Sequence, residues 1–138
     1  MDLHVSPVSQ TPIYEQLKQQ IREQVLTGKL APGVMLPSIR GLARECQVGI
    51  ITVKRAYDDL CSEGILNAHP GKGVFVTELS PDRVRDIWKE QVKDQLADVL
   101  SFAALAGLSA AEVKQLLEEV TEDGTADRDR DLMPGSMF

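Results

Sequence analysis

The chain has 138 residues, of which 43% are hydrophobic, 26% charged and 4% aromatic, a composition typical of a globular protein with an aliphatic core. No apolar run of about 18 residues is present, which argues against a membrane-spanning helix. The N-terminus lacks a secretory signal, and Cys46 and Cys61 have no metal-binding spacing. We therefore expect a cytoplasmic protein with reduced thiols and with no metal or cofactor.

The net charge of −6 argues by itself against a nucleic-acid partner, but the charge is unevenly distributed. Residues 1–77 contain 8 Lys and Arg against 7 Asp and Glu, whereas residues 78–138 contain 7 against 14. DNA binding depends on a local basic face rather than on the charge of the whole chain. The N-terminal half therefore remains a candidate DNA-binding domain.

The first predicted element is a helix that follows a loose arm at residues 1–10. Thr11 is placed to cap this helix, and Pro12 to occupy its first position. Gly28 ends the helix, because glycine readily adopts the left-handed conformation of a helix C-cap. The apolar side chains of the helix recur every fourth residue: Ile13, Leu17, Ile21 and Val25.

Two shorter helices and a hairpin follow. A small strand at residues 34–36 precedes a helix over 38–46 and another from about residue 50 to residue 63. Two helices joined by so short a connection can pack at a steep angle, so that the second enters a DNA major groove. Short strands at 65–68 and 74–77 complete a mainly α fold with a small β-hairpin. This order of elements is that of a winged helix-turn-helix.

The C-terminal half contains two further predicted helices. Ser80 and Pro81 open the fourth helix, and Ser109 with Glu112 forms a capping box for the fifth. The apolar stripe of the fourth helix is Val84, Trp88, Val92, Leu96, Val99 and Ala103, and that of the fifth is Val113, Leu116, Leu117 and Val120. A monomer would expose much of this long stripe, so we expect a homodimer.

Polar residues on the free sides of the second and third helices are candidate DNA contacts, because they suit phosphate oxygens and guanine edges. They are Arg40 and Arg44 in the second helix and Thr52, Lys54 and Arg55 in the third. Arg55 could instead pair with Asp58 or Asp59 one turn further on. On residues alone, a small helical bundle with exposed cations would look similar.

The turn at residues 69–73 is a candidate minor-groove contact. It is basic at Lys72, and Gly71 and Gly73 leave it thin enough to approach a groove. Ser38 is foremost a helix cap, although it could also donate to a phosphate, since helix N-termini attract anions.

Residues 11–77 carry an ordered set of short motifs. They are PIYEQL from Pro12, GKLAPG from Gly28, LPSIR from Leu36, TVKRAY from Thr52, EG from Glu63 and GKGVF from Gly71. This set resembles the GntR family of bacterial regulators, and the short two-helix tail is similar to the family's YtrA-type subgroup. The resemblance implies a winged helix-turn-helix that binds double-stranded operator DNA, followed by a pair of helices that dimerises.

The resemblance also implies roles for individual positions. Arg40 would contact operator DNA, residues 49–54 would begin the recognition helix, and the wing tip would enter the minor groove. The candidate DNA-binding residues are Ser38, Arg40, Arg44, Gly49, Ile50, Thr52, Lys54, Arg55, Pro70, Gly71 and Lys72. The candidate dimerisation residues are Trp88, Val92, Leu96, Val99, Ala103, Val113, Leu116 and Leu117.

Three positions depart from the family pattern. Gly41 stands where the family often has Glu, which removes a capping-box partner of Ser38. Ile50 stands where some members have Arg, so a direct guanine contact is absent there. Gly49 replaces a usual Ser, Thr or Asn, and is a weaker helix cap.

The sequence thus predicts a DNA-binding domain at 1–77, a dimerisation segment at 78–122 and a disordered acidic tail at 123–138. We expect a homodimeric repressor of a roughly palindromic operator, controlling, as the resemblance suggests, a transporter operon. Two alternatives are a regulator with a small-molecule site at the dimer interface around Trp88, and a winged helix that binds protein. An enzyme is least supported, because no nucleophile–base pair, phosphate loop or metal signature is present. The operator, the regulated genes and any effector are not encoded in recognisable form.

Overall fold

The computed structural model describes residues 1–123, and the chain divides into two compact units. The first unit runs from Met1 to Trp88, and the second begins at Lys89. The acidic tail expected at 123–138 lies, beyond Asp123, outside the described residues. The functional division after residue 77 stays a prediction.

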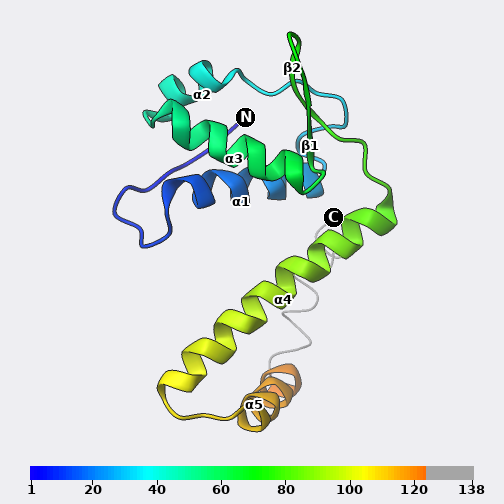
Figure 1. Ribbon diagram of the computed structural model, residues 1–138. Coiled ribbons are helices and arrows are strands. Elements are labelled where there is room, and N and C mark those ends of the chain that lie inside the picture. Colours follow the sequence, from blue (N-terminus) through cyan, green and yellow to red (C-terminus); the bar gives the residue numbers. More distant parts are fainter. Residues whose placement is uncertain (124–138) are drawn as a thin grey trace. The chain divides into compact units, whose positions relative to one another are not determined.

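The first unit contains three helices, a hairpin and the start of a long fourth helix (Figure 1). These elements are α1 (Ile13–Leu26), α2 (Ile39–Cys46), α3 (Ile50–Ser62), β1 (Leu66–His69), β2 (Gly73–Val76) and α4 (Pro81–Leu105). The strands pair antiparallel, with Leu66 opposite Val76. The predicted mainly α fold with a small hairpin is confirmed, and each strand is displaced by one residue from its predicted bounds.

The segment expected as a small strand forms only a single bridge, between Met35 and Phe75. Around this bridge the Leu36 amide donates to the Val74 carbonyl at 2.8 Å, and the Val76 amide donates to the Val34 carbonyl at 2.9 Å. The hairpin is therefore held along β2 by the chain that leads into α2.

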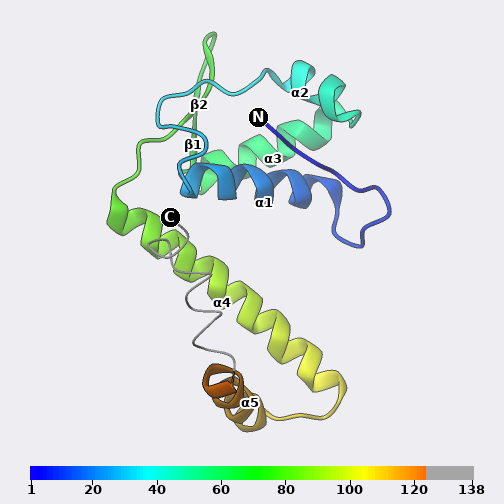
Figure 2. The same ribbon diagram turned by 180° about the vertical axis from the view of Figure 1, so that it is seen from behind.

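The core of the first unit lies between α1 and α3, which run side by side in both views (Figure 2). Aliphatic side chains from both helices are fully buried there, including Leu17, Ile21 and Leu60. Tyr57 is buried among them, and its hydroxyl donates to the Pro37 carbonyl at 2.8 Å. This bond satisfies a polar group inside an apolar core and ties α3 to the segment before α2.

The N-terminal arm is docked on α1, so the prediction of a loose arm was wrong. Three glutamines spaced four residues apart along α1 hold alternate residues of the arm by their backbone groups. Four residues of helix rise about 6.0 Å and two residues of extended chain about 6.6 Å, so the two repeats match. The pairs are Gln24 Nε2 to Asp2 O at 2.7 Å, Gln20 with both backbone groups of His4 at 2.6 and 2.8 Å, and Gln16 with both of Ser6 at 2.7 and 2.9 Å.

The start of α1 also differs from the sequence prediction. Pro12 is the N-cap residue of α1, with φ −54 and ψ 147, and no side chain caps the helix. Thr11 was expected to cap it and does not; its carbonyl instead accepts a hydrogen bond from Gln16 Nε2 at 2.8 Å. Gln16 therefore bridges the arm and the start of the helix.

The first two turns of α4 complete the core of the first unit. Ile87 is only 6% exposed and belongs to the core cluster, and Val84 packs against the same cluster. Trp88, which the apolar stripe placed next to Val84, keeps 37% of its surface exposed. At the start of α4 the core-facing residues are therefore Val84 and Ile87, three positions apart, rather than Val84 and Trp88, four positions apart.

The second unit consists of the rest of α4 and of α5 (Ala110–Asp123). The predicted capping box is confirmed: the Glu112 amide donates to Ser109 Oγ at 3.2 Å, and the Ser109 amide donates to Glu112 Oε1 at 3.3 Å. No single helix within residues 1–123 is long and apolar enough to cross a membrane. Only α4 and α5 together, bent by 117°, reach that length and composition.

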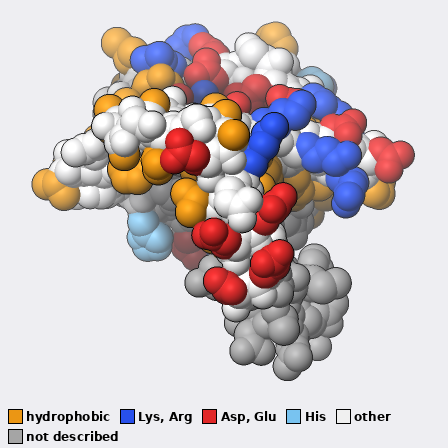
Figure 3. Space-filling model, turned by 90° about the horizontal axis from the view of Figure 1, so that it is seen from below, with side chains coloured by type: hydrophobic (Ala, Val, Ile, Leu, Met, Phe, Trp, Pro, Cys, Tyr) orange, Lys and Arg blue, Asp and Glu red, His pale blue; other side chains and the backbone are white. Residues whose placement is uncertain are grey.

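Most apolar side chains of the second unit are exposed. Among those described, Ala103 is buried at 8% exposure, whereas the leucines and valines of both helices remain partly or largely exposed. Figure 3 shows one face of the molecule, on which hydrophobic side chains reach the surface between acidic and basic ones. Apolar side chains of α4, α5 and the turn between them line a groove of about 520 Å³. They are Leu96, Val99, Phe102, Ala103, Leu105, Ala106, Leu108, Val113, Leu116, Leu117 and Val120.

Candidate nucleic-acid interface

Helix α2 presents two exposed arginines, Arg40 in its first turn and Arg44 in its last. Ser38 is its N-cap, and Ser38 Oγ accepts a hydrogen bond from the Gly41 amide at 3.0 Å. Gln47 ends the helix in the left-handed conformation, with φ 57. The predicted cap of α2 is thus confirmed, and its hydroxyl oxygen is occupied as an acceptor.

Helix α3 begins directly after the turn that follows α2. Gly49 is its N-cap, with φ −71, and supplies no side-chain hydrogen bond. Ile50 is 45% exposed and Ile51 is 83% exposed, whereas Thr52 is partly buried. The exposed end of α3 is therefore apolar. Ile51 lies within the segment 49–54 predicted to begin the recognition helix, but it was not named among the candidate DNA-binding residues.

Lys54 and Asp58 form an ion pair on the exposed side of α3. Their Nζ and Oδ2 atoms are 2.6 Å apart, and each side chain keeps 61% of its surface exposed. An exposed pair one helical turn apart contributes little to stability. The pair matters electrostatically, because the Asp58 carboxylate offsets the charge of Lys54, which we expect to contact DNA phosphate.

Arg55 stacks on Tyr14 of α1, with its guanidinium carbon 3.5 Å from the ring centroid. No ion pair between Arg55 and Asp58 or Asp59 is formed; these acids pair with Lys54 and Lys18 instead. Contacts between α1 and α3 repeat every fourth residue along both helices: Tyr14 with Arg55, Lys18 with Asp59 and Arg22 with Glu63. Arg55 is thus the end of a polar seam between the two helices.

The wing tip is exposed at Pro70, Gly71 and Lys72. Gly71 has φ 77, a conformation that side chains with a Cβ rarely adopt, and the Lys72 amide donates to the His69 carbonyl at 2.9 Å. The tip is therefore a tight turn with small side chains and one cation, Lys72.

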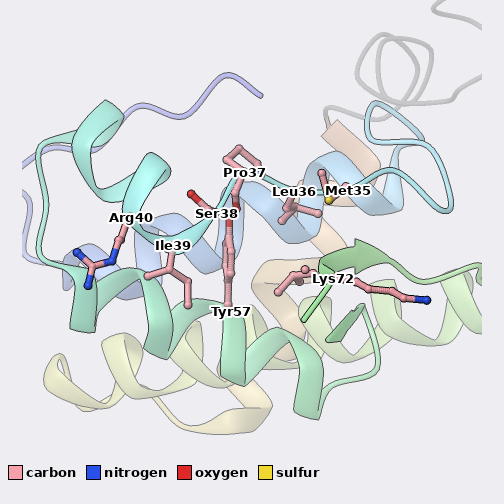
Figure 4. A pocket seen from close by; sticks show the side chains of 10 residues that line it. Met35, Leu36, Pro37, Ser38, Ile39, Arg40, Tyr57 and Lys72 are labelled. Atoms are coloured by element: carbon pink, nitrogen blue, oxygen red, sulfur yellow. Dashed lines mark hydrogen bonds between the residues drawn. The ribbon is translucent and has the colours of Figure 1, made fainter. Parts of the chain in front are cut away.

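A pocket of about 430 Å³ lies between the start of α2 and β2 (Figure 4). Arg40 and Lys72 lie at its two ends, with their charged groups turned away from each other, and Tyr57 lies between them. The fold thus brings together side chains separated by 32 positions in the sequence, so that one surface carries a cation from α2 and one from the wing.

The cysteines do not add a reactive or metal-binding site. Burial raises the pKa of both thiols, and the nearby carboxylates of Glu45 and Asp58 raise the pKa of Cys46 and Cys61 respectively. A raised pKa leaves little of the reactive thiolate near neutral pH. Within residues 1–123, no group of three or more His, Cys, Asp or Glu residues is arranged to hold a metal ion.

Comparisons with known proteins agree with this architecture. The family model described as "Bacterial regulatory proteins, gntR family" matches residues 13–76. The HTH-type transcriptional repressor YtrA of Bacillus subtilis (strain 168) is 33% identical over 121 residues, covering 88% of this chain and 93% of the relative.

Two solved structures are similar to this chain over most of its length. A GntR family transcriptional regulator from Listeria monocytogenes has a TM-score of 0.61 at 26% identity, covering 81% of this chain and 97% of that one. YtrA from Sulfolobus acidocaldarius, a GntR-family transcription factor, has a TM-score of 0.55 at 34% identity, covering 69% and 97%. The chain therefore belongs to the GntR family and is a YtrA-like, winged helix-turn-helix DNA-binding transcription regulator rather than an enzyme.

Proposed function

We propose that this protein is a repressor that binds a roughly palindromic operator as a homodimer. The observation that carries the proposal is that Arg40 of α2 and Lys72 of the wing lie at the two ends of one pocket beside α3, whose N-terminal end is exposed. In this arrangement α3 enters the major groove, Arg40 and Arg44 bind the DNA backbone or a base edge, and Lys72 binds at the minor groove. Residues 1–77 are then the DNA-binding domain.

The homodimer is supported by the apolar groove on α4 and α5. Its leucines and valines are exposed in a single chain, whereas soluble proteins seldom leave so large an apolar patch open. A two-fold axis would set the same patch against itself, with α4 and α5 of each copy covering those of the other. Two recognition helices would then contact two half-sites of one operator.

Repression follows from the relationship to the Bacillus subtilis repressor, which this chain matches along most of its length. Control of a transporter operon, and a cytoplasmic location, rest on the resemblance to the YtrA-type subgroup alone.

A small-molecule effector remains the second candidate, because the same groove could hold an apolar ligand. Its lining is apolar throughout and does not include Trp88, around which a ligand site was expected. The groove lacks the convergent polar groups that usually orient a ligand. The dimer accounts for the groove without requiring a further molecule.

The proposal is tested by recovering genomic fragments that the purified protein binds and titrating the enriched duplex. We expect a site with two related half-sites, one dimer per site, and affinity that falls steeply with salt. The slope of log K against log [salt] should be about −0.9 for each phosphate contact. A site without internal symmetry, one bound monomer per site, or a flat salt response would contradict the proposal.

A further inference from the structure

The exposed end of α3 carries two large apolar side chains where a DNA-reading helix usually offers hydrogen-bond donors. Ile51 is 83% exposed and Ile50 is 45% exposed. The buried face of α3 is made of Val53, Ala56, Tyr57 and Leu60. By the helical period, Ile51 lies on the opposite side from these residues, so it contributes nothing to the core.

Ile51 shares its face with the charged residues of α3. Lys54 follows it by three residues and is ion-paired with Asp58 on the same side of the helix. Arg55 follows it by four and stacks on Tyr14 of α1. The exposed apolar side chain therefore stands on the face that carries cations. Duplex DNA offers phosphate to the lysine and base edges to the isoleucine.

The first turn of α3 has little capacity for hydrogen bonding to bases. Gly49, Ile50 and Ile51 have no side-chain donor or acceptor, and Thr52, the first residue that has one, is partly buried. Among the groups exposed in the major groove, the apolar one is the C5-methyl group of thymine. An isoleucine at the tip of the helix is apolar like that group and can pack against it.

We propose that Ile51, supported by Ile50, reads thymine through contact with its C5-methyl group in the major groove. The inference rests on the proposed function, and makes thymine the specificity determinant of each half-site. Arg40, Arg44 and Lys72 make the contacts described above, and the isoleucine pair adds the discrimination for thymine.

The test begins with a duplex selected from a random-sequence pool by the full-length wild-type protein. Each thymine is then replaced, one at a time, by deoxyuridine, which lacks only the C5-methyl group and keeps every hydrogen bond of the base pair. At one or two positions in each half-site we expect affinity to fall about fourfold, the amount expected for one methyl-sized group left unburied. Replacements elsewhere should leave affinity unchanged.

The variant Ile51→Ala closes a double-mutant cycle with the modified duplex. It should bind the thymine duplex more weakly and lose most of the deoxyuridine penalty, because the contact is already absent. Val8→Ala is the matched control, since Val8 is also apolar and is 90% exposed. It should keep both the affinity and the penalty of the wild type.

The possible failures are distinguishable. If the selected duplex shows no deoxyuridine penalty in either half-site, or if Ile51→Ala keeps the full penalty, the thymine inference is overturned and the proposed function stands. If the wild-type protein selects no sequence from the pool, the proposed function fails and this inference fails with it. The deoxyuridine series on wild-type protein can overturn the inference even if the variant does not fold, and Ile51→Val then tests the assignment to Ile51 with a smaller change.

Discussion

The two units of this chain use the same aliphatic side chains in opposite ways. In the first unit, Leu17, Ile21 and Leu60 are fully buried between helices of the same chain. In the second, Val92, Leu96 and Leu116 keep between 45% and 54% of their surface exposed. Helix α5 leaves the apolar side chains of α4 exposed, and residues of both helices line the same open groove.

Similar hydrophobic patterns in one chain can therefore end either buried in a core or exposed to solvent. An apolar stripe that finds a partner within the chain stabilises the fold, whereas one that finds none stays exposed until a second molecule covers it. The first unit thus has its core within one chain, whereas the apolar side chains of the second are the ones that the proposed dimer would cover.

The largest expected effect comes from placing a charge on the open face of the second unit. Leu96→Glu should leave the first unit folded but should prevent association, because an unpaired carboxylate would be buried in the dimer. Operator affinity should then fall by at least about 100-fold, since each half-site contact loses the effective concentration supplied by the other. Sedimentation and titration of the same sample measure both effects.

Ser101→Glu is the matched control for this prediction. Ser101 is exposed and lies on the opposite side of α4 from Leu96, so the same charge there should change neither mass nor affinity. A Leu96→Glu protein that stays dimeric would show that α4 is not the dimerisation surface.

The second prediction tests whether the start of α4 belongs to the first unit. Ile87→Ala should lower the free energy of unfolding by about 2–5 kcal/mol, because Ile87 is buried in that core. Amide hydrogen exchange in α1 and α3 reports this loss without depending on association. Leu105 is 86% exposed. Leu105→Ala should therefore change the free energy of unfolding obtained from the same exchange rates by less than about 0.5 kcal/mol.

The third prediction concerns charge on the side of the first unit that we propose to face DNA. Asp58→Asn removes the carboxylate that lies 2.6 Å from Lys54 Nζ, and so frees the lysine and removes a repulsion toward phosphate. Affinity for any duplex should rise about fivefold at low salt, equivalent to about 1 kcal/mol between unit charges in water. Titration at several salt concentrations checks it, and Asp98→Asn, on α4, should have no such effect.

The smallest expected effect concerns the docked N-terminal arm. Gln20→Ala removes both hydrogen bonds to the backbone of His4 and should cost about 0.5–1.5 kcal/mol of unfolding free energy. Gln19→Ala changes a neighbouring exposed glutamine and should cost less. Urea unfolding of the two variants gives the comparison, and equal midpoints would show that the arm does not stabilise the first unit.

Much of the fold could be predicted from local patterns. The cap at Ser38, the capping box of Ser109 with Glu112, and the end of α1 near Gly28 all follow from residues within one turn of one another. The candidate site was recognisable from the family motifs, and its exposed arginines follow from the helical period. Ile51 could have been identified in the same way, since it lies opposite the buried face of α3.

The remaining features depend on how distant segments meet. The arm was expected to be loose because nothing within residues 1–10 indicates that Gln16, Gln20 and Gln24 present a matching row of amides. Arg55 was expected to face DNA or a nearby acid, and its stacking on Tyr14 requires α1 and α3 to pack side by side.

The helices, the caps of α2 and α5, the turns and the family can be predicted from the sequence, because they depend on spacing and on side chains a few residues apart. Only the tertiary structure decided that Ile87 rather than Trp88 enters the core, that the arm docks on α1, and that Arg40 and Lys72 border one surface. The physical reason is that local periodicity defines which face of an element is apolar. Which other element covers that face, or whether any does, depends on packing between residues far apart in the chain.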